Sequence, residues 1–153
     1  MRKPAWFEEG IRFTCTRSGN CCTGDPGAVW LNEEEERAIA RRKHISLSAF
    51  RARYTTPVEG RPSVVEVPSP RGNRCVFLKE ATAGCTVYEA RPGQCRTWPF
   101  WPENLRTLRA WINAARDCPG VARGLEGKGK LHSAKEVRAL RDGTPVDPKS
   151  YKV

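Results

Sequence analysis

Seven cysteines in a chain with few aliphatic residues constrain this sequence most. Leu, Ile, Val and Phe together make up only 28 of its 153 residues, and its formal net charge is +10. Such a composition borders on that of disordered proteins, yet five tryptophans and seven cysteines indicate a folded chain. We therefore expect cross-links to supplement a thin core, either as disulfides or as metal–thiolate bonds.

The sequence favours metal–thiolate bonds over disulfides. No stretch reaches the ~18 consecutive apolar residues of a membrane span, and residues 1–9 contain no apolar signal core. The expected compartment is therefore the reducing cytoplasm, where cysteine-rich chains more often bind metals than form disulfides. An odd number of cysteines also suits a disulfide framework poorly, because one thiol is left over.

The spacing of the cysteines does not select one kind of metal site. The order is C-x5-C-C, a gap of 52 residues, C-x9-C-x9-C, and 22 residues to the last cysteine. Neither the C-x2-C spacing of zinc fingers nor a ferredoxin spacing occurs. Neighbouring glycines provide backbone freedom, and neighbouring cations favour the thiolate. The alternative, that the cysteines are small buried hydrophobic residues, is less favoured for seven residues that nearly all lie beside Gly, Pro or Arg.

Local signals predict a small α+β domain with short strands, a few helices and much irregular structure organised around a cysteine cluster. We expect one domain over residues 1–153, with a metal-binding region at 13–124 and a C-terminal helix and tail at 131–153. The charge is dispersed, and 19 of the 27 basic residues are Arg. Binding to nucleic acid is therefore an alternative that the sequence does not favour.

Capping residues and turn residues predict the individual elements. Helices are expected from Asn32 to about Lys43, after Ser46, and over 134–141 after Ser133, because each begins at a capping residue. Further expectations are short strands at 64–67 and 75–78, a helix or strand at 105–115, and a loop at 118–130.

Other conspicuous residues receive structural interpretations. Trp98, Phe100 and Trp101 are expected to cover a small core, and Glu33 to Glu36 to form a solvated helix start. His44 is expected at a helix end, and His132 is isolated, so neither histidine is a predicted ligand.

An ordered set of motifs runs through most of residues 11–124. Its pieces are Phe13-Thr14-Cys15, Gly19-Asn20-Cys21-Cys22, Val29-Trp30-Leu31 with Glu33 to Glu36, Cys75-Val76-Phe77-Leu78, Gly84-Cys85-Thr86-Val87-Tyr88, Arg91-Pro92-Gly93-Gln94-Cys95-Arg96, Trp98-Pro99-Phe100 and Cys118-Pro119-Gly120. This set resembles the YkgJ-type cysteine-cluster family, whose members are described as zinc- or iron-chelating proteins. The resemblance implies seven thiolate ligands, which are Cys15, Cys21, Cys22, Cys75, Cys85, Cys95 and Cys118.

One position departs from the family pattern. Many members have a cysteine where this chain has Ser18, and a serine hydroxyl is a poor ligand for soft metals. Seven thiolates can build one closed four-cysteine site and one three-cysteine site with an open or labile position. Arg91 and Arg96 are predicted to donate hydrogen bonds to thiolate sulfurs.

The predicted function is therefore chelation of zinc or iron ions through thiolates, with an iron–sulfur cluster as an alternative form of the iron. Two other classes stay open. One is an iron- or iron–sulfur-dependent protein-modifying enzyme, which an open coordination position would favour. The other is a basic, zinc-stabilised nucleic-acid-binding module, which tight and strongly salt-dependent binding would favour. The sequence assigns no catalytic residue and no protein partner.

Overall fold

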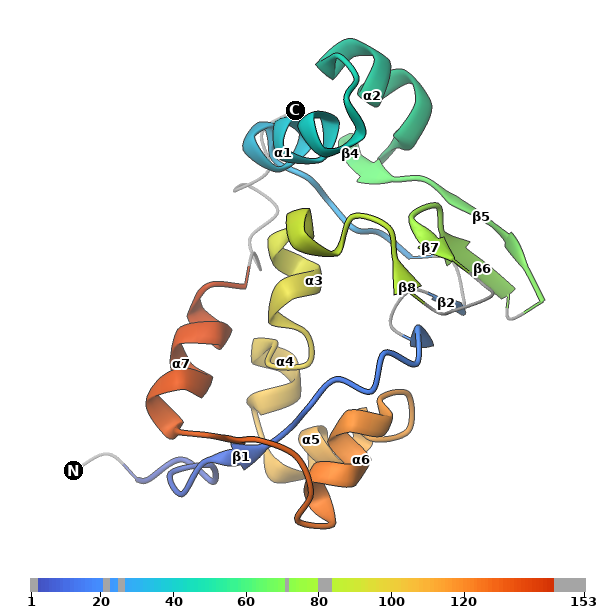
Figure 1. Cartoon of the computed structure of the whole chain (residues 1–153). Helices are drawn as coiled ribbons and strands as arrows, with labels where there is room; N and C mark the ends of the chain where they lie inside the picture. The colour runs from blue at the N-terminus through green and yellow to red at the C-terminus, as the bar shows by residue number, and fades with distance from the viewer. Residues whose placement is uncertain (1–2, 21–22, 25–26, 71, 80–83, 145–153) are drawn as a thin grey trace. The chain divides into compact units, whose positions relative to one another are not determined.

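The computed structural model describes residues 3–20, 23–24, 27–70, 72–79 and 84–144. They fall into two compact units, each with its own core. Unit 1 comprises the described residues of Met1–Ser18 and Thr97–Thr144, and unit 2 comprises those of Gly19–Arg96. Helices alternate with short antiparallel strands and irregular segments (Figure 1), which confirms the α+β prediction. The prediction of one domain stays a prediction.

Two helices of unit 2 begin at the predicted capping residues. Helix α1 spans Glu33–Lys43, and its N-cap Asn32 forms a complete capping box with Glu35. His44 ends this helix in the left-handed conformation, with a φ of 58°. Helix α2 spans Leu47–Tyr54, and the Ser46 hydroxyl accepts a hydrogen bond from its first turn. These starts were predictable because side chains within three residues determine them.

The strands of unit 2 begin and end at other residues than the sequence predicted. All of these strands pair antiparallel. Strand β3 (Thr55–Val58) pairs with β4 (Arg61–Val64), and β7 (Leu78–Lys79) pairs with β8 (Gly84–Cys85). Strand β6 (Gly72–Cys75) lies between β5 (Glu66–Ser69) and β2 (Thr23–Gly24) and pairs with both. The expected strand at 64–67 divides between β4 and β5, and the one at 75–78 between β6 and β7. Prolines within β3, β4 and β5 lack the N–H that a longer ladder needs.

The core of unit 2 lies between its two long helices and these hairpins. It consists of Leu31, Ile39, Ala40, Phe50, Val64, Phe77 and Val87. Beyond the strands, the 3-10 helix η2 (Tyr88–Ala90) leads to α3 (Gly93–Thr97), within which the chain passes into unit 1.

Unit 1 is mainly helical. Its helices are α4 (Pro102–Leu105), α5 (Leu108–Ala114), α6 (Pro119–Leu125) and α7 (Ala134–Asp142). Residues 105–115, ambiguous from sequence, are thus helical where they are regular. The loop expected at 118–130 is wrong for its first half, because Pro119 occupies the first turn of α6, a position for which its fixed φ is suited. Ser133 caps α7 as predicted, accepting from the Glu136 N–H.

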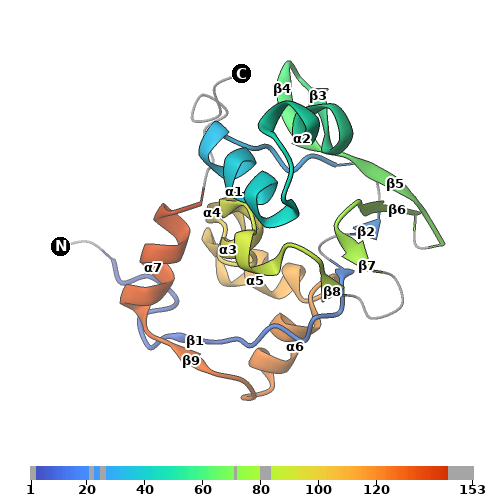
Figure 2. The same ribbon diagram turned by 45° about the horizontal axis from the view of Figure 1, so that its top comes forward.

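Helix α6 packs unusually close to the N-terminal segment of unit 1. A Cβ at Gly124 would lie 1.8 Å from the Arg12 carbonyl oxygen, and one at Gly120 would lie 2.6 Å from that of Thr14. Both positions therefore require glycine. The same segment forms β1 (Ile11–Arg12), which pairs antiparallel with β9 (Leu131–His132), as Figure 2 shows.

An aromatic core stabilises unit 1. Trp111 and Phe100 are stacked, with ring centroids 5.5 Å apart, and Phe13 meets Phe100 edge to face. The predicted role of Phe100 in a core is confirmed, and Trp98 packs against the same cluster.

Among the described helices, none has both the length and the apolar character that a membrane crossing requires.

Candidate metal centre

Cys75 and Cys85 occupy the ends of two short strands of unit 2. Cys75 is the last residue of β6 and pairs with Glu66, while Cys85 is the last residue of β8 and pairs with Leu78. The Thr86 N–H donates to the Phe77 carbonyl at 2.7 Å, which extends this pairing by one bond. Both cysteines are half-buried against the unit 2 core. Strand pairing therefore places Cys85 opposite Leu78, which follows Cys75 by three positions.

Strand β2 brings a third part of the sequence to β6. Thr23, which follows Cys22 in the sequence, pairs with Arg74, which precedes Cys75. Cys21 and Cys22 themselves lie outside the described residues.

Cys95 is carried by the short helix α3 and is half-buried. Its N–H donates to the Pro92 carbonyl at 3.0 Å, which begins the first helical turn. The two preceding residues contact the first turn of α1 and the segment before it. The Gly93 N–H donates to Glu35 Oε2, and Gln94 Nε2 donates to the Ala28 carbonyl at 2.9 Å. Contacts distant in sequence therefore fix the start of this helix.

Cys118 and Cys15 belong to unit 1. Cys118 is buried in the aromatic core and is the N-cap residue of α6. Cys15 is exposed, and its Sγ accepts a hydrogen bond from the Arg17 N–H at 3.3 Å. Arg17 has a φ of 56°, in the left-handed region.

The residues before Cys15 form hydrogen bonds with Lys130 and His132. The Phe13 N–H donates to the Lys130 carbonyl, and the Lys130 N–H donates to Thr14 Oγ1, both at 2.9 Å. His132 Nε2 lies 3.0 Å from the Phe13 carbonyl oxygen, and its Nδ1 lies 3.3 Å from Glu136 Oε2. Both ring nitrogens of His132 therefore contact oxygen atoms. The sequence missed this role because it depends on a pairing over more than a hundred residues.

The donor chemistry fits zinc or iron. The described candidate ligands are cysteine sulfurs, which both metals bind as thiolates. Next to Cys85, the Thr86 hydroxyl is buried and has no hydrogen-bond partner among the described residues. Within the same ranges, no three His, Cys, Asp or Glu side chains form a group that could hold a metal ion. The predicted set of seven ligands therefore stays a prediction.

The two arginines predicted to support the thiolates differ in their surroundings. The Arg91 guanidinium stacks on the Tyr88 ring, 3.8 Å from its centroid, and its Nε donates to the Tyr88 carbonyl at 3.0 Å. Both of these contacts of the Arg91 side chain are with Tyr88, three residues earlier in the chain. Arg96 is exposed on α3, next to Cys95. Their hydrogen bonding to sulfur stays a prediction.

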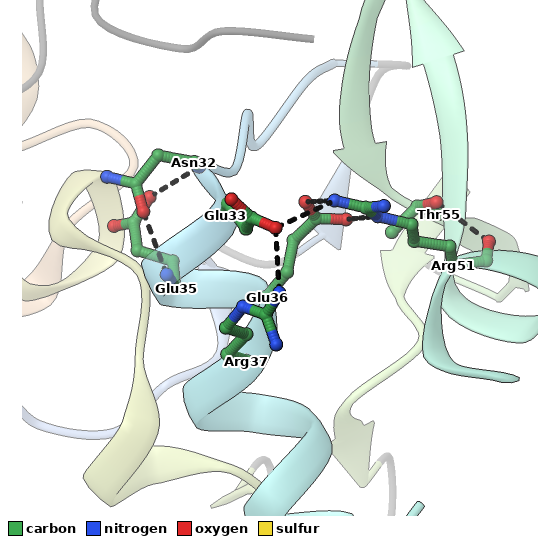
Figure 3. Close-up of polar contacts among 7 residues, drawn as sticks. All are labelled: Asn32, Glu33, Glu35, Glu36, Arg37, Arg51 and Thr55. Atoms are coloured by element: carbon green, nitrogen blue, oxygen red, sulfur yellow. Dashed lines mark hydrogen bonds and ion pairs between the residues drawn. The ribbon is translucent and has the colours of Figure 1, made fainter. Parts of the chain in front are cut away.

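The expectation that Glu33 to Glu36 all lie in solvent is wrong for Glu36. Its side chain is 2% exposed, because it shares a helix face with the buried Ile39 and Ala40. The Arg51 guanidinium donates to both Glu36 oxygens at 3.2 Å (Figure 3), and these bonds raise the pKa of Arg51. Arg51 comes from α2, so the sequence of α1 alone gave no signal for this pair.

Comparison with known proteins agrees with the cysteine chemistry. Residues 14–119 match the model of the family CxxCxxCC, described as a "putative zinc- or iron-chelating domain". The chain therefore belongs to this family, and the family prediction is confirmed. An uncharacterized protein of Methanocaldococcus jannaschii, MJ0661, is 27% identical over 94 residues, which are 61% of this chain and 48% of that protein. The chain thus spans about half the length of this relative. No solved structure matches it.

Proposed function

We propose that this protein binds zinc or iron through thiolates of Cys15, Cys21, Cys22, Cys75, Cys85, Cys95 and Cys118. The observation that carries the proposal is the placement of Cys75 and Cys85. Strand pairing holds both half-buried at the ends of short ladders, where apolar packing limits the access of water. A bound ion would cross-link the segments that carry its thiolate ligands, and so would contribute folding free energy.

The choice among a zinc ion, an iron ion and an iron–sulfur cluster is part of the proposal to be tested. Thiolates bind all three, and a reducing compartment such as the cytoplasm would keep these cysteines available. The protein should be purified without oxygen and its metal content measured by mass spectrometry. Stoichiometric zinc in a colourless protein would indicate a structural ion, and broad visible absorbance would indicate an iron–sulfur cluster.

Single Cys→Ser variants test the ligands. We expect C75S, C85S and C95S to lower both the metal content and the melting temperature, because serine is a poor ligand for these metals. Ser69→Ala, in the same hairpin as Cys75, is the control and should keep the parent metal content. A folded parent protein that contains no metal would overturn the proposal.

Ser18→Cys tests the idea of an open or labile position. It restores the cysteine that many family members have, so we expect a larger fraction of the metal to resist a mild chelator. Uniform release from the parent protein, unchanged in S18C, would contradict the two-site arrangement while leaving thiolate binding intact.

A further inference from the structure

Glu35 uses both oxygens of its carboxylate for different partners. Its Oε1 accepts from the Asn32 N–H at 3.0 Å, and its own N–H donates to Asn32 Oδ1 at 2.8 Å (Figure 3). This reciprocal pair is the capping box of α1. The second oxygen, Oε2, accepts from the Gly93 N–H, which lies 58 positions further along the chain. The capping box needs only one oxygen, so the second is available to fix another segment.

The segment that Glu35 fixes begins α3, the helix that carries Cys95. Gly93 is buried, and its N–H donates to Glu35 Oε2 away from bulk water. The neighbouring Gln94 Nε2 donates to the Ala28 carbonyl. The two residues before Cys95 are therefore bound to the first turn of α1 and to the segment that precedes it.

Helix α3 needs such attachments. It spans only five residues, far fewer than the ~12–15 that an isolated helix requires for marginal stability in water. The orientation of α3 therefore depends on tertiary contacts. The direction of the Cys95 thiol depends in turn on the orientation of this helix. A side chain that orients a ligand from outside the coordination sphere typically changes metal affinity by about 10- to 100-fold when it is replaced.

We propose that Glu35 is a positioning residue that aligns Cys95 for metal binding, in addition to capping α1. This inference rests on the proposed thiolate site. Glu35 acts through Gly93 and the first turn of α3 and does not itself contact the metal.

Glu35→Gln separates the two roles. Glutamine at this position retains a capping box, because its amide oxygen can accept from the Asn32 N–H. Its other terminal atom is a donor and cannot accept from Gly93. The matched control is Glu34→Gln, which removes the same charge from an exposed neighbour on the same helix.

The measurement is the rate at which the metal-loaded protein, purified without oxygen, loses metal to excess EDTA, followed by metal analysis. Circular dichroism reports the helix content in parallel. We expect E35Q to release the Cys95-dependent metal about 10- to 100-fold faster than the parent, with unchanged helix content. E34Q should release it at the parent rate. In a C95S background, E35Q should cause no further acceleration, because the two changes act on the same ligand.

Three results would overturn the inference. One is E35Q releasing metal at the rate of E34Q, and another is E35Q accelerating release equally with and without Cys95. Both leave the proposed function standing, whereas a metal-free folded parent overturns both together. If E35Q does not fold, Gly93→Pro replaces it, since proline lacks the N–H that donates to Glu35, leaves the cap of α1 intact and suits the first position of α3. Parent-like release from G93P would then overturn the inference.

Discussion

Units 1 and 2 differ in their cores and in their number of cysteines. Unit 1 contains four of the five tryptophans, and Trp111 is fully buried among other aromatic rings. Unit 2 has a smaller core and strands of two to four residues. The distribution of cysteines is reversed. Only Cys15 and Cys118 belong to unit 1, and the other five belong to unit 2.

This difference predicts where metal–thiolate cross-links would contribute most to stability. Burying a large aromatic side chain contributes a few kcal/mol, so unit 1 can be stabilised by its apolar core. Two- and four-residue strands bury little and pair through few hydrogen bonds, so the hairpins of unit 2 are weak alone. We therefore expect thiolate–metal bonds to contribute more to unit 2 than to unit 1.

The largest expected effect follows from metal removal under reducing conditions. Structural zinc can contribute roughly 10 kcal/mol in small zinc-binding peptides, so the hairpins of unit 2 should lose most of their protection from hydrogen exchange. Peptides covering α5 and α7 of unit 1 should keep theirs. Hydrogen–deuterium exchange measured by mass spectrometry gives both readings from one sample. Equal loss of protection in the two units would contradict the comparison.

The reverse experiment weakens the apolar core of unit 1. Trp111→Ala removes a fully buried ring that stacks on Phe100, and we expect a loss of about 3–5 kcal/mol in the free energy of unfolding. Urea titration followed by circular dichroism measures it. The control is Trp30→Ala, since Trp30 is only partly buried and should cost less. A loss in W111A well below 3 kcal/mol would show that the aromatic core is not what stabilises unit 1.

Local chemistry was readable from the sequence, and tertiary chemistry was not. The caps Asn32, Ser46 and Ser133 were predicted because each side chain bonds within three residues. Helix α6 was missed because its glycines resemble those of a loop. Only the structure shows that Gly120 and Gly124 admit the backbone of Arg12 to Thr14.

The candidate metal site likewise has features that the sequence predicts and features that depend on tertiary contacts. Cysteine chemistry and a family pattern predict the thiolate ligands, because that prediction needs only residue type and order. The strand register around Cys75 and the contact of Glu35 with Gly93 depend on residues brought together by folding. The burial of Glu36 likewise depends on Arg51, fifteen residues away.

The close packing of α6 gives the next prediction. Gly124→Ala would place a Cβ 1.8 Å from a backbone oxygen, so the helix must shift, and we expect a loss of about 3 kcal/mol in unit 1. Gly127→Ala is the matched control. Gly127 has open space around it and a φ of 85°, so alanine there should cost only the ~1 kcal/mol of a left-handed conformation. Thermal unfolding followed by tryptophan fluorescence compares the two variants. Similar losses would show that α6 tolerates displacement.

The smallest expected effect concerns the ion pair between α1 and α2 of unit 2. Arg51→Ala leaves the buried Glu36 carboxylate without its guanidinium partner, and we expect a loss of about 1–2 kcal/mol. Arg37→Ala is the control, because Arg37 pairs with Glu33 on an exposed helix face and should cost only about 0.3–0.5 kcal/mol.

The pH dependence of the Arg51 contribution sharpens this last comparison. Hydrogen bonding to Glu36 raises the pKa of Arg51 above its already high ordinary value. A raised pKa stabilises the folded state at every pH below the unfolded pKa, and the contribution is lost only as pH rises through the folded pKa. The difference in unfolding free energy between the parent and R51A should therefore stay constant between about pH 6 and 9. Urea titrations at several pH values measure it. A difference that shrinks as pH rises through this range would mean that another group, rather than Arg51, compensates the buried carboxylate.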